Sequence, residues 1–133
     1  MSLAVVDASV LTVFYVSDDA RRGAVAVRLA AGDALFAPAH LDVEVASALR
    51  GLARASRTVE RAAPRALAHL VGFPIRRMPI APVLQRIWQL RGNVTAYDAA
   101  YIALAEQLDC ALITCDAKLA AASGPRCAID LIT

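Results

Sequence analysis

Four acidic residues stand where charged side chains are uncommon, beside apolar residues that a folded chain would bury. Asp7 follows the apolar run LAVV, Asp116 follows ALIT, Glu44 lies near the start of an amphipathic segment, and Asp98 lies within TAYDAAYIALA. Charged groups seldom lie this close to a core unless a partner compensates them. The spacing therefore raises the question whether these carboxylates share one site.

The chemistry of such a site follows from its ligand types. Carboxylates in one pocket repel one another and raise each other's pKa values unless a cation is present. Oxygen ligands without paired His or Cys favour a hard ion, Mg²⁺ or Mn²⁺. Mg²⁺ keeps several waters and usually takes one or two protein carboxylates together with phosphate oxygens. The chemistry that fits is metal-assisted hydrolysis of a phosphodiester.

Each of three aspartates also has an ordinary structural interpretation. Asp7 and Asp116 fit turn or N-cap positions after strands, and Thr95-Ala-Tyr-Asp98 matches a helix capping box. Capping and membership of a site are compatible, because a first-turn residue points towards the N-terminal end of its helix. Both interpretations stay open for all three residues at this stage.

Glu44 is the most informative of the four acids. On a helical wheel of about 100° per residue, it lies at the margin of an apolar arc, whereas Arg50 and Arg54 lie on the other side. The arc consists of Leu41, Val45, Ala48, Leu49 and Leu52. A Glu that serves only solubility would lie with the arginines. Its alternative role is to interact with the helix dipole in the first turn.

Strand and helix patterns alternate along the chain. Strands are expected within 3–9, 34–39, 73–81, 110–116 and 127–133. Helices are expected at 10–16, 18–32, 41–55, 58–72, 82–92, 95–109 and 118–123. In the second helix, Asp18 or Asp19 is the expected N-cap and Gly32 the stop, and Pro64 is expected to limit the start of the fourth. This order predicts a single α/β domain over residues 1–133 with a mainly parallel sheet flanked by helices.

In an open parallel sheet, ligand sites form outside the carboxyl ends of the strands. Asp7 and Asp116 each follow a predicted strand, so the two are expected to meet at that edge. If the N-terminal end of its helix faces the same edge, Asp98 joins them there.

The composition excludes several classes of protein. The chain has 133 residues, 59% of them hydrophobic, with a mean hydropathy of +0.53, which indicates a globular domain. No apolar run is long enough to predict a membrane span. The start has no basic region typical of a signal peptide, so the cytoplasm is the expected compartment. The net charge of +2 does not by itself indicate a nucleic-acid binder.

The other residues with chemical potential give weaker signals. Cys110, Cys115 and Cys127 form no C-x-x-C pair and no even disulfide set, so they are interpreted as small apolar residues. His40 and His69 have no partner at metal-ligand spacing, and His40 is interpreted as a loop residue before the Glu44 helix.

Taken together, these motifs resemble those of a known family. DASVL at 7–11, Glu44, TAYDAAYIALA at 95–105 and LITCD at 112–116 occur in the order found in PIN domains. More narrowly, the chain resembles the VapC-type toxins of bacterial toxin–antitoxin pairs. The likeness covers nearly the whole chain, and the two C-terminal motifs with their fixed gap are its most specific part.

The resemblance implies a PIN fold, an activity and a set of site residues. Asp7, Glu44, Asp98 and Asp116 would form the acidic metal site and carry catalysis, with Ser9 and Thr114 as supporting residues. The implied activity is that of a Mg²⁺-dependent endoribonuclease, with Mn²⁺ as a possible substitute, that cuts structured RNA of the tRNA or rRNA class. The implied partners are a cognate antitoxin and a second copy of the chain in a homodimer.

Arginines are the expected contacts for the RNA backbone. Of the 14 basic residues only Lys118 is a lysine, and arginine suits bidentate phosphate contacts. Arg50, Arg54 and Arg57 are the candidates, with Arg61 and Arg65 in the same helical region; a solvated helix face is the alternative interpretation. Trp88 and Tyr97 are interpreted as core or dimer residues rather than as platforms for bases.

Parts of this pattern also occur in three other classes of protein. A haloacid-dehalogenase-like phosphatase needs a second Asp two residues after the first, where this chain has Ser9. A receiver domain needs adjacent acids after the first strand and a Lys after the last, and neither is present. The remaining alternative is a non-catalytic PIN-like module that dimerises and binds a small protein partner.

Overall fold

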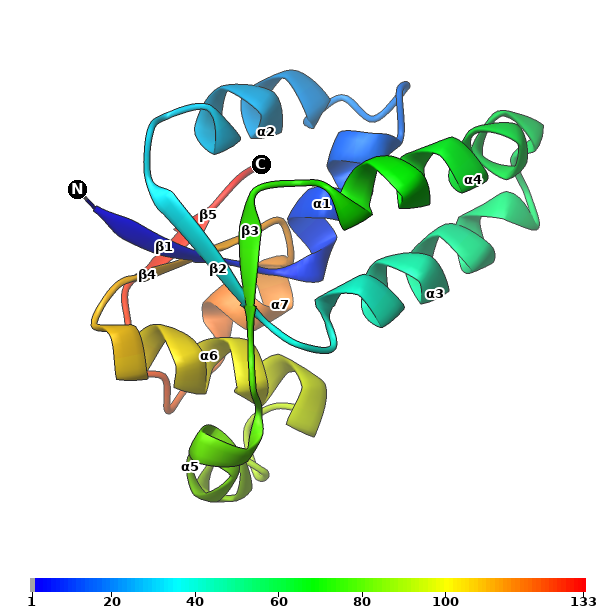
Figure 1. Cartoon of the computed structure of the whole chain (residues 1–133). Helices are drawn as coiled ribbons and strands as arrows, with labels where there is room; N and C mark the ends of the chain where they lie inside the picture. The colour runs from blue at the N-terminus through cyan, green and yellow to red at the C-terminus, as the bar shows by residue number, and fades with distance from the viewer. Residues whose placement is uncertain (1) are drawn as a thin grey trace.

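A five-stranded, entirely parallel sheet forms the centre of the molecule (Figure 1). The computed structural model describes residues 2–133, so Met1 of the predicted domain lies outside the described residues. The strands are β1 (Leu3–Val6), β2 (Ala34–Pro38), β3 (Ile75–Met78), β4 (Ala111–Thr114) and β5 (Ile129–Leu131), in the spatial order β3-β2-β1-β4-β5. The predicted α/β fold with a parallel sheet is confirmed.

The central strands are short and continuously apolar because helices cover both of their faces. Ala4, Val5 and Val6 of β1 are fully buried, as are Leu112 and Ile113 of β4. These two strands pair directly, with Val6 opposite Ile113. The core of the molecule therefore lies around the β1–β4 pair.

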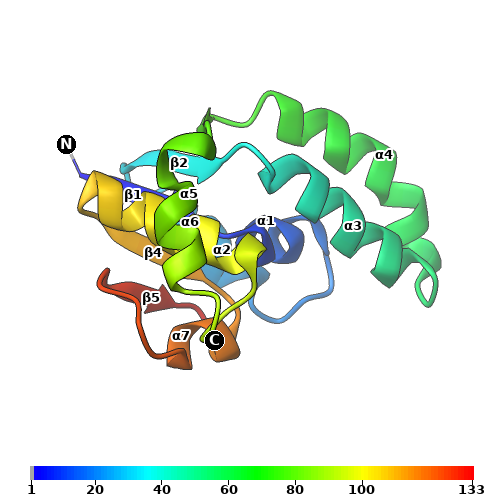
Figure 2. The same ribbon diagram turned by 90° about the horizontal axis from the view of Figure 1, so that it is seen from below.

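The helices connect the strands and cover the sheet. They are α1 (Ala8–Tyr15), α2 (Arg22–Leu29), α3 (Leu41–Ala53), α4 (Arg57–Val71), the 3₁₀ turn η1 (Ala81–Val83), α5 (Leu84–Gln89), α6 (Ala96–Leu108) and α7 (Ala117–Ala121). Figure 1 shows α2 above the sheet and α6 below it, and α3 and α4 lie side by side and project from the sheet in both views (Figures 1 and 2).

Helix α6 is buried over seven consecutive residues, 99–105, because it packs against β1, β2 and β4. Its sequence is therefore apolar around most of its circumference rather than along one stripe. This packing fixes where its N-terminal end, which carries Asp98, meets the sheet.

The strand order creates a crevice between β1 and β4. The connection after β1 leads to its neighbour β2, whereas the connection after β4 leads to β5 on the opposite side. Chain segments leaving the two strands therefore diverge, and ligands bind at such switch points of parallel sheets. Asp7 directly follows β1, and Asp116 lies two residues after the end of β4.

The second helix begins later than predicted. Asp19 does not act as an N-cap; its carboxylate accepts hydrogen bonds from the backbone N–H and the guanidinium of Arg21. Helix α2 accordingly starts at Arg22 and ends at Leu29, and Gly32 lies beyond its end with a φ of 97°. The prediction was wrong because a local Asp–Arg pair competes for the expected cap.

The prediction for Pro64 was also wrong. Ser56 accepts a hydrogen bond from the N–H of Val59 and caps α4, which begins at Arg57, so Pro64 lies inside the helix. Proline removes one helical hydrogen bond there, but packing of α4 along α3 outweighs that local loss.

Two aromatic side chains and one leucine lie farther out than expected. Trp88 is 67% exposed and Tyr97 is 65% exposed, so neither is a core residue. Leu52, assigned to the apolar arc of α3, is 43% exposed because this end of α3 extends beyond the sheet. Within residues 2–133, no helix has both the length and the apolar composition needed to span a membrane.

A glycine substitution tests the packing of the loop after α7. Gly124 has a φ of 103°, and a Cβ atom there would lie 3.0 Å from Nδ2 of Asn93 and 3.2 Å from a methyl group of Leu90. Gly124→Ala is expected to lower the free energy of unfolding by about 1–2 kcal/mol. Gly23→Ala is the control, because a Cβ in that helical position meets no atom within 4 Å and is expected to be neutral or stabilising. Urea denaturation of both variants measures the effect, and an unchanged midpoint for Gly124→Ala would contradict it.

Candidate active site

The four predicted acids line one cleft of about 470 Å³ at the carboxyl ends of β1 and β4. Asp7 and Asp116 enter it from the ends of the two strands, Glu44 from the first turns of α3 and Asp98 from the first turn of α6. Residues separated by more than a hundred positions are thus brought to one edge of the sheet.

Asp7 is 5% exposed, and two hydroxyl groups hold its carboxylate. Ser9 Oγ and Thr114 Oγ1 both donate hydrogen bonds to Asp7 Oδ2, at 2.7 and 2.8 Å. Burial raises the pKa of Asp7 and repulsion from Glu44 raises it further, although the two hydroxyl groups act in the opposite direction. Oδ1 of Asp7 receives neither of these hydroxyl bonds.

The two hydroxyl groups also orient the chain after β4. Ser9 Oγ accepts the N–H of Cys115 at 2.9 Å, and Thr114 Oγ1 accepts the N–H of Asp116 at 3.0 Å. Because each hydroxyl has one proton and donates it to Asp7, the 3.3 Å approach between the two oxygens is a contact rather than a hydrogen bond. Ser9 and Thr114 therefore hold both the carboxylate of Asp7 and the segment that carries Asp116.

Asp116 caps α7, as its structural interpretation predicted. Its Oδ1 accepts the N–H of Lys118 at 2.9 Å and the N–H of Leu119 at 3.4 Å. Oδ2 receives neither bond. One side chain thus fixes the start of a short helix and still lines the cleft.

Glu44 is partly buried and has two partners. Tyr101 Oη donates to Glu44 Oε1 at 2.7 Å, and His40 Nε2 lies 3.2 Å from the same oxygen. Burial alone would raise the pKa of Glu44, but hydrogen bonds from His40 and Tyr101 outweigh it and lower the pKa. Burial likewise opposes protonation of His40, yet its pairing with Glu44 raises the pKa of the imidazole. His40 lies in the turn directly before α3, as the sequence indicated, and it is also a partner of Glu44 in the site.

Asp98 lies at the third position of α6, where the Thr95 hydroxyl accepts its N–H at 3.2 Å. Burial raises the pKa of its carboxyl group, and the negative charges of Asp7, Glu44 and Asp116 raise it further, to about 6. The repulsion between carboxylates that the sequence led us to expect thus contributes to the raised pKa of Asp98.

Three of the four carboxylates use only one of their two oxygens in the hydrogen bonds described above. They are Asp7, Glu44 and Asp116. Their other oxygens are the available ligands, and hard divalent ions prefer such oxygens. The donor set therefore fits Mg²⁺ or Mn²⁺. In the arrangement of residues 2–133, no three His, Cys, Asp or Glu side chains converge on one ready-made metal position.

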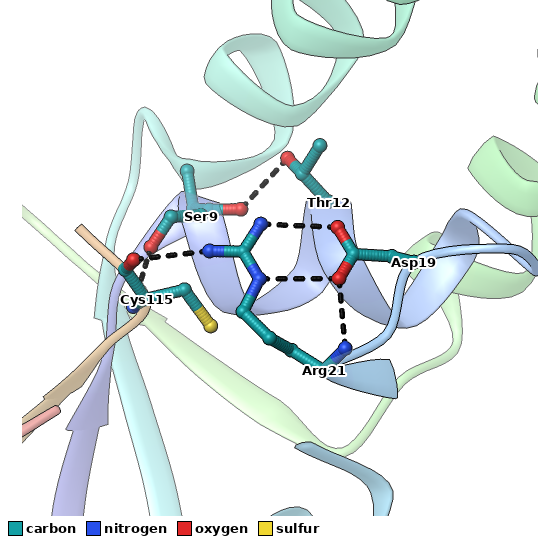
Figure 3. A network of polar contacts seen from close by, with 6 residues as sticks. Ser9, Thr12, Asp19, Arg21 and Cys115 are labelled. Carbon is teal, nitrogen blue, oxygen red and sulfur yellow. Dashed lines mark hydrogen bonds and ion pairs between the residues drawn. The ribbon is translucent and has the colours of Figure 1, made fainter. Parts of the chain in front are cut away.

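Asp19 and Arg21, which the sequence analysis did not select for the site, also line this cleft. The guanidinium of Arg21 pairs with Asp19 through Nε at 3.1 Å and Nη2 at 3.0 Å, and its Nη1 donates to the carbonyl of Cys115 at 3.2 Å (Figure 3). Arg21 thereby ties the loop before α2 to the segment that carries Asp116. No local sequence pattern distinguishes Arg21, which lines the cleft, from the adjacent Arg22, which does not.

The arginines predicted to contact RNA lie outside the cleft. Arg50 is exposed near the C-terminal end of α3, Arg54 is the C-cap of that helix, and Arg57 begins α4. All three are on the projecting pair of helices rather than beside the acids.

Comparison with known proteins agrees with this fold and motif order. The PIN domain family model matches residues 4–125. The ribonuclease VapC9 of Mycobacterium tuberculosis is 38% identical over 128 residues, which span 96% of this chain and 97% of that protein. The ribonuclease VapC12 of the same species is 39% identical over 110 residues, 83% of this chain and 85% of its own.

Two solved structures share the fold. A crystal structure of Mycobacterium tuberculosis VapC20, described as a toxin that cleaves the sarcin–ricin loop, gives a TM-score of 0.71 at 20% identity, covering 89% of this chain and 93% of its own. A protein from Pyrobaculum aerophilum gives a TM-score of 0.69 at 29% identity, covering 97% of this chain and 83% of its own.

The all-parallel sheet and the family match define a PIN-domain protein. Its sequence identity to VapC9 and VapC12 over most of the chain also shows to which group within this family it belongs. The chain belongs to the VapC ribonucleases of the PIN-domain family.

Removing the phenolic hydroxyl next to Glu44 tests the cause of its lowered pKa. Tyr101→Phe is expected to raise the pKa of Glu44, because the ionised carboxylate loses a donor. The same change is expected to lower the free energy of unfolding at neutral pH by about 1 kcal/mol. Carboxyl-detected NMR titration measures the pKa, and Tyr97→Phe is the matched control because its side chain is exposed. Equal titration curves for Tyr101→Phe and the unmodified protein would contradict the assignment.

Neutralising Asp98 tests the repulsion within the cleft. Its pKa in the folded protein is about 6, above the ordinary value of 3.8, so its ionisation opposes folding as the pH rises through this window. Asp98→Asn is therefore expected to stabilise the metal-free protein at pH 7 by roughly 1 kcal/mol, a value discounted for partial exposure of the side chain.

The stabilisation by Asp98→Asn should be complete above pH 6 and disappear near pH 4. Thermal unfolding across this range measures it, with Asp18→Asn, an exposed acid outside the cleft, as the control. A pH-independent difference between Asp98→Asn and the unmodified protein would show that charge repulsion is not its source.

Proposed function

We propose that this protein is a divalent-metal-dependent endoribonuclease and the toxin of a VapC-type toxin–antitoxin pair. It hydrolyses phosphodiester bonds of RNA in the cleft lined by Asp7, Glu44, Asp98 and Asp116. The observation that carries the proposal is that four carboxylates share one cleft, while three of them keep one oxygen outside the hydrogen bonds of the scaffold. The sequence identity to VapC ribonucleases supports the reaction class.

Mg²⁺ is the proposed cofactor, with Mn²⁺ as a substitute. Asp7, Asp98, Asp116 and Glu44 would hold it, and when bound it supplies the Lewis acidity that phosphodiester hydrolysis requires. Burial and, to a smaller extent, repulsion between carboxylates raise the pKa values of Asp7 and Asp98, and a bound cation would offset that repulsion.

The residues of the chain have distinct roles in the proposed reaction. Ser9 and Thr114 fix the carboxylate of Asp7 by donating to Oδ2, so that Oδ1 is available to a ligand. Tyr101 and His40 keep Glu44 ionised and oriented. The substrate must approach an acidic cleft, and Arg21, which lines it, supplies positive charge beside Asp116. Asp98 would release its proton when the cation binds.

The proposed substrate is a structured RNA of the tRNA or rRNA class, and the proposed site of action is the cytoplasm. Arg50, Arg54 and Arg57 are proposed to contact its phosphates, because all three are exposed and close to the helices that border the cleft. Arginine binds phosphate in a bidentate manner and adds a salt-dependent component to affinity.

The proposed protein partners are a cognate antitoxin and a second copy of the chain. An antitoxin would act by covering the acid-lined cleft and denying RNA access to it. Exposure of the large side chains Trp88 and Tyr97 supports an interface between copies. The alternative is a non-catalytic PIN-like module that dimerises and binds a partner. A measurement of RNA cleavage distinguishes it from the proposed nuclease.

Metal dependence and single acid variants test the proposal directly. The purified protein is expected to cleave RNA with Mg²⁺ or Mn²⁺ and to lose cleavage in EDTA. Asp116→Asn and Asp98→Asn are expected to reduce the rate by about two orders of magnitude or more, because each removes a negatively charged metal ligand.

Asp109→Asn is the matched control for these acid variants. Asp109 is an exposed acid with a φ of 51°, a conformation that Asn tolerates, so this variant should keep full activity. Full activity of Asp116→Asn would reject the assigned site. Absence of cleavage by the unmodified protein on tRNA and rRNA, together with binding of a protein partner, would favour the non-catalytic module.

A further inference from the structure

A second depression, of about 710 Å³, lies beside the acidic cleft and has the opposite character. One wall is a face of α4 that carries Arg61, Arg65 and His69, and the other is the end of α1 with Tyr15 and the nearby Arg22. We refer to this depression as the basic groove. Where the cleft has five acids and one arginine, the basic groove has three arginines and no acid.

Four basic residues of α4 form a regular row. Arg57, Arg61, Arg65 and His69 are spaced four residues apart, and all four side chains are exposed. Each step advances about 6 Å, so the row extends over roughly 18 Å of the helix. Like charges at this spacing repel and destabilise a helix. Among residues 2–133, Arg57, Arg61 and Arg65 form no ion pair that would relieve this repulsion.

The opposite wall is held in place by specific contacts. Tyr15 Oη and His69 Nδ1 form a hydrogen bond of 2.7 Å across the groove. The Arg22 guanidinium stacks on Phe14 at 5.2 Å from the ring centroid, and its Nε donates to the carbonyl of Phe14 at 2.9 Å. Neither Nη1 nor Nη2 of Arg22 makes a hydrogen bond within the described part of the chain. The groove is therefore a preformed surface with donors on two sides.

The basic groove and the acidic cleft lie on either side of the last turn of α1. Val13 and Val16 line the cleft, while Phe14 and Tyr15 line the groove. The loop after α1 also contributes to both, with Asp19 and Arg21 in the cleft and Ser17 and Arg22 in the groove. The two depressions are therefore lined by neighbouring residues of the chain.

We propose that the basic groove binds the sugar–phosphate backbone of the RNA segment next to the cleavage site. This inference rests on the proposed nuclease function and assigns a second binding surface to the same substrate. Guanidinium groups pair with phosphates in a bidentate manner, and basic grooves that follow the backbone are the usual device for binding a single strand. The regular spacing of charge along α4, and the neighbouring residues of α1 that line both the groove and the cleft, favour RNA over an acidic protein segment.

Binding and cleavage measurements on one double variant test the proposal. Arg61→Gln/Arg65→Gln is compared with Arg76→Gln/Arg126→Gln, which removes the same charge from exposed positions outside both depressions. Binding of a labelled single-stranded RNA of mixed sequence is measured in EDTA, with Asp98→Asn present in both proteins to prevent cleavage. Thermal unfolding establishes that both double variants are folded.

The groove variant is expected to bind this RNA roughly tenfold more weakly at low salt and to show a smaller salt dependence, by about 1.4 in the slope of log K against log salt. The control variant should bind as the parent does. In proteins with intact Asp98, the groove variant should cleave a dinucleotide that fills only the cleft at the parental rate, and should cleave the longer RNA more slowly.

Each alternative outcome has a distinct meaning. Unchanged RNA affinity and unchanged cleavage of the longer RNA would overturn the groove assignment and leave the nuclease proposal intact. If RNA affinity and cleavage are unchanged but the groove variant binds an Asp/Glu-rich peptide more weakly, the groove would be assigned to a protein partner instead. Groove-dependent RNA binding by a parent protein that cleaves no RNA with any divalent metal would reject the nuclease proposal and retain the groove.

Discussion

The site depends on one buried carboxylate and the two hydroxyl groups that hold it. Asp7 follows β1, Thr114 ends β4, and Ser9 lies in the first turn of α1, so the bonds to Asp7 Oδ2 join these elements at the edge of the sheet. The same hydroxyl groups accept backbone N–H groups from the segment that leads to Asp116. A buried acid would be costly in isolation, but here it organises the polar end of an apolar strand pair.

The four acids differ electrostatically because their neighbours differ. Glu44 has a tyrosine hydroxyl and an imidazole as partners, and its pKa is lowered. Asp98 is partly buried and has three other carboxylates around it, and both burial and their charges raise its pKa, to about 6. The protein therefore stabilises the ionised form of Glu44, whereas it disfavours ionisation of Asp98. Such opposed environments within one cleft are typical of sites that handle ions and protons.

Much of this arrangement could be predicted from the sequence, because the relevant signals are local. Apolar runs followed by an acid predicted where β1 and β4 end, and the alternation of strands and helices predicted the parallel sheet. The displacement of Glu44 from the arginine face of its helix indicated a partly buried role, and Tyr101 and His40 are the reason.

Other features could not be predicted because they depend on tertiary contacts. Arg21 looks identical to Arg22 in the sequence, yet one guanidinium lines the cleft and the other stacks on Phe14. Pro64 and Asp19 carry strong local signals that packing and a neighbouring arginine override. The exposure of Trp88 follows from where α5 lies on the surface, which its apolar sequence does not reveal.

The pairing of the first strand with the fourth also has a consequence for synthesis of the protein. The partner of β1 that completes the cleft is β4, and Asp116, which follows β4, lies 109 positions after Asp7. A nascent chain on the ribosome can form β1, β2 and their helices before β4 is translated, but it has no complete set of acids until Asp116 has been added. The cleft therefore cannot form before β4 is made, so products that terminate before β4 lack it. For an enzyme that acts on RNA, this order of assembly delays the acid-lined cleft until its last acid has been translated.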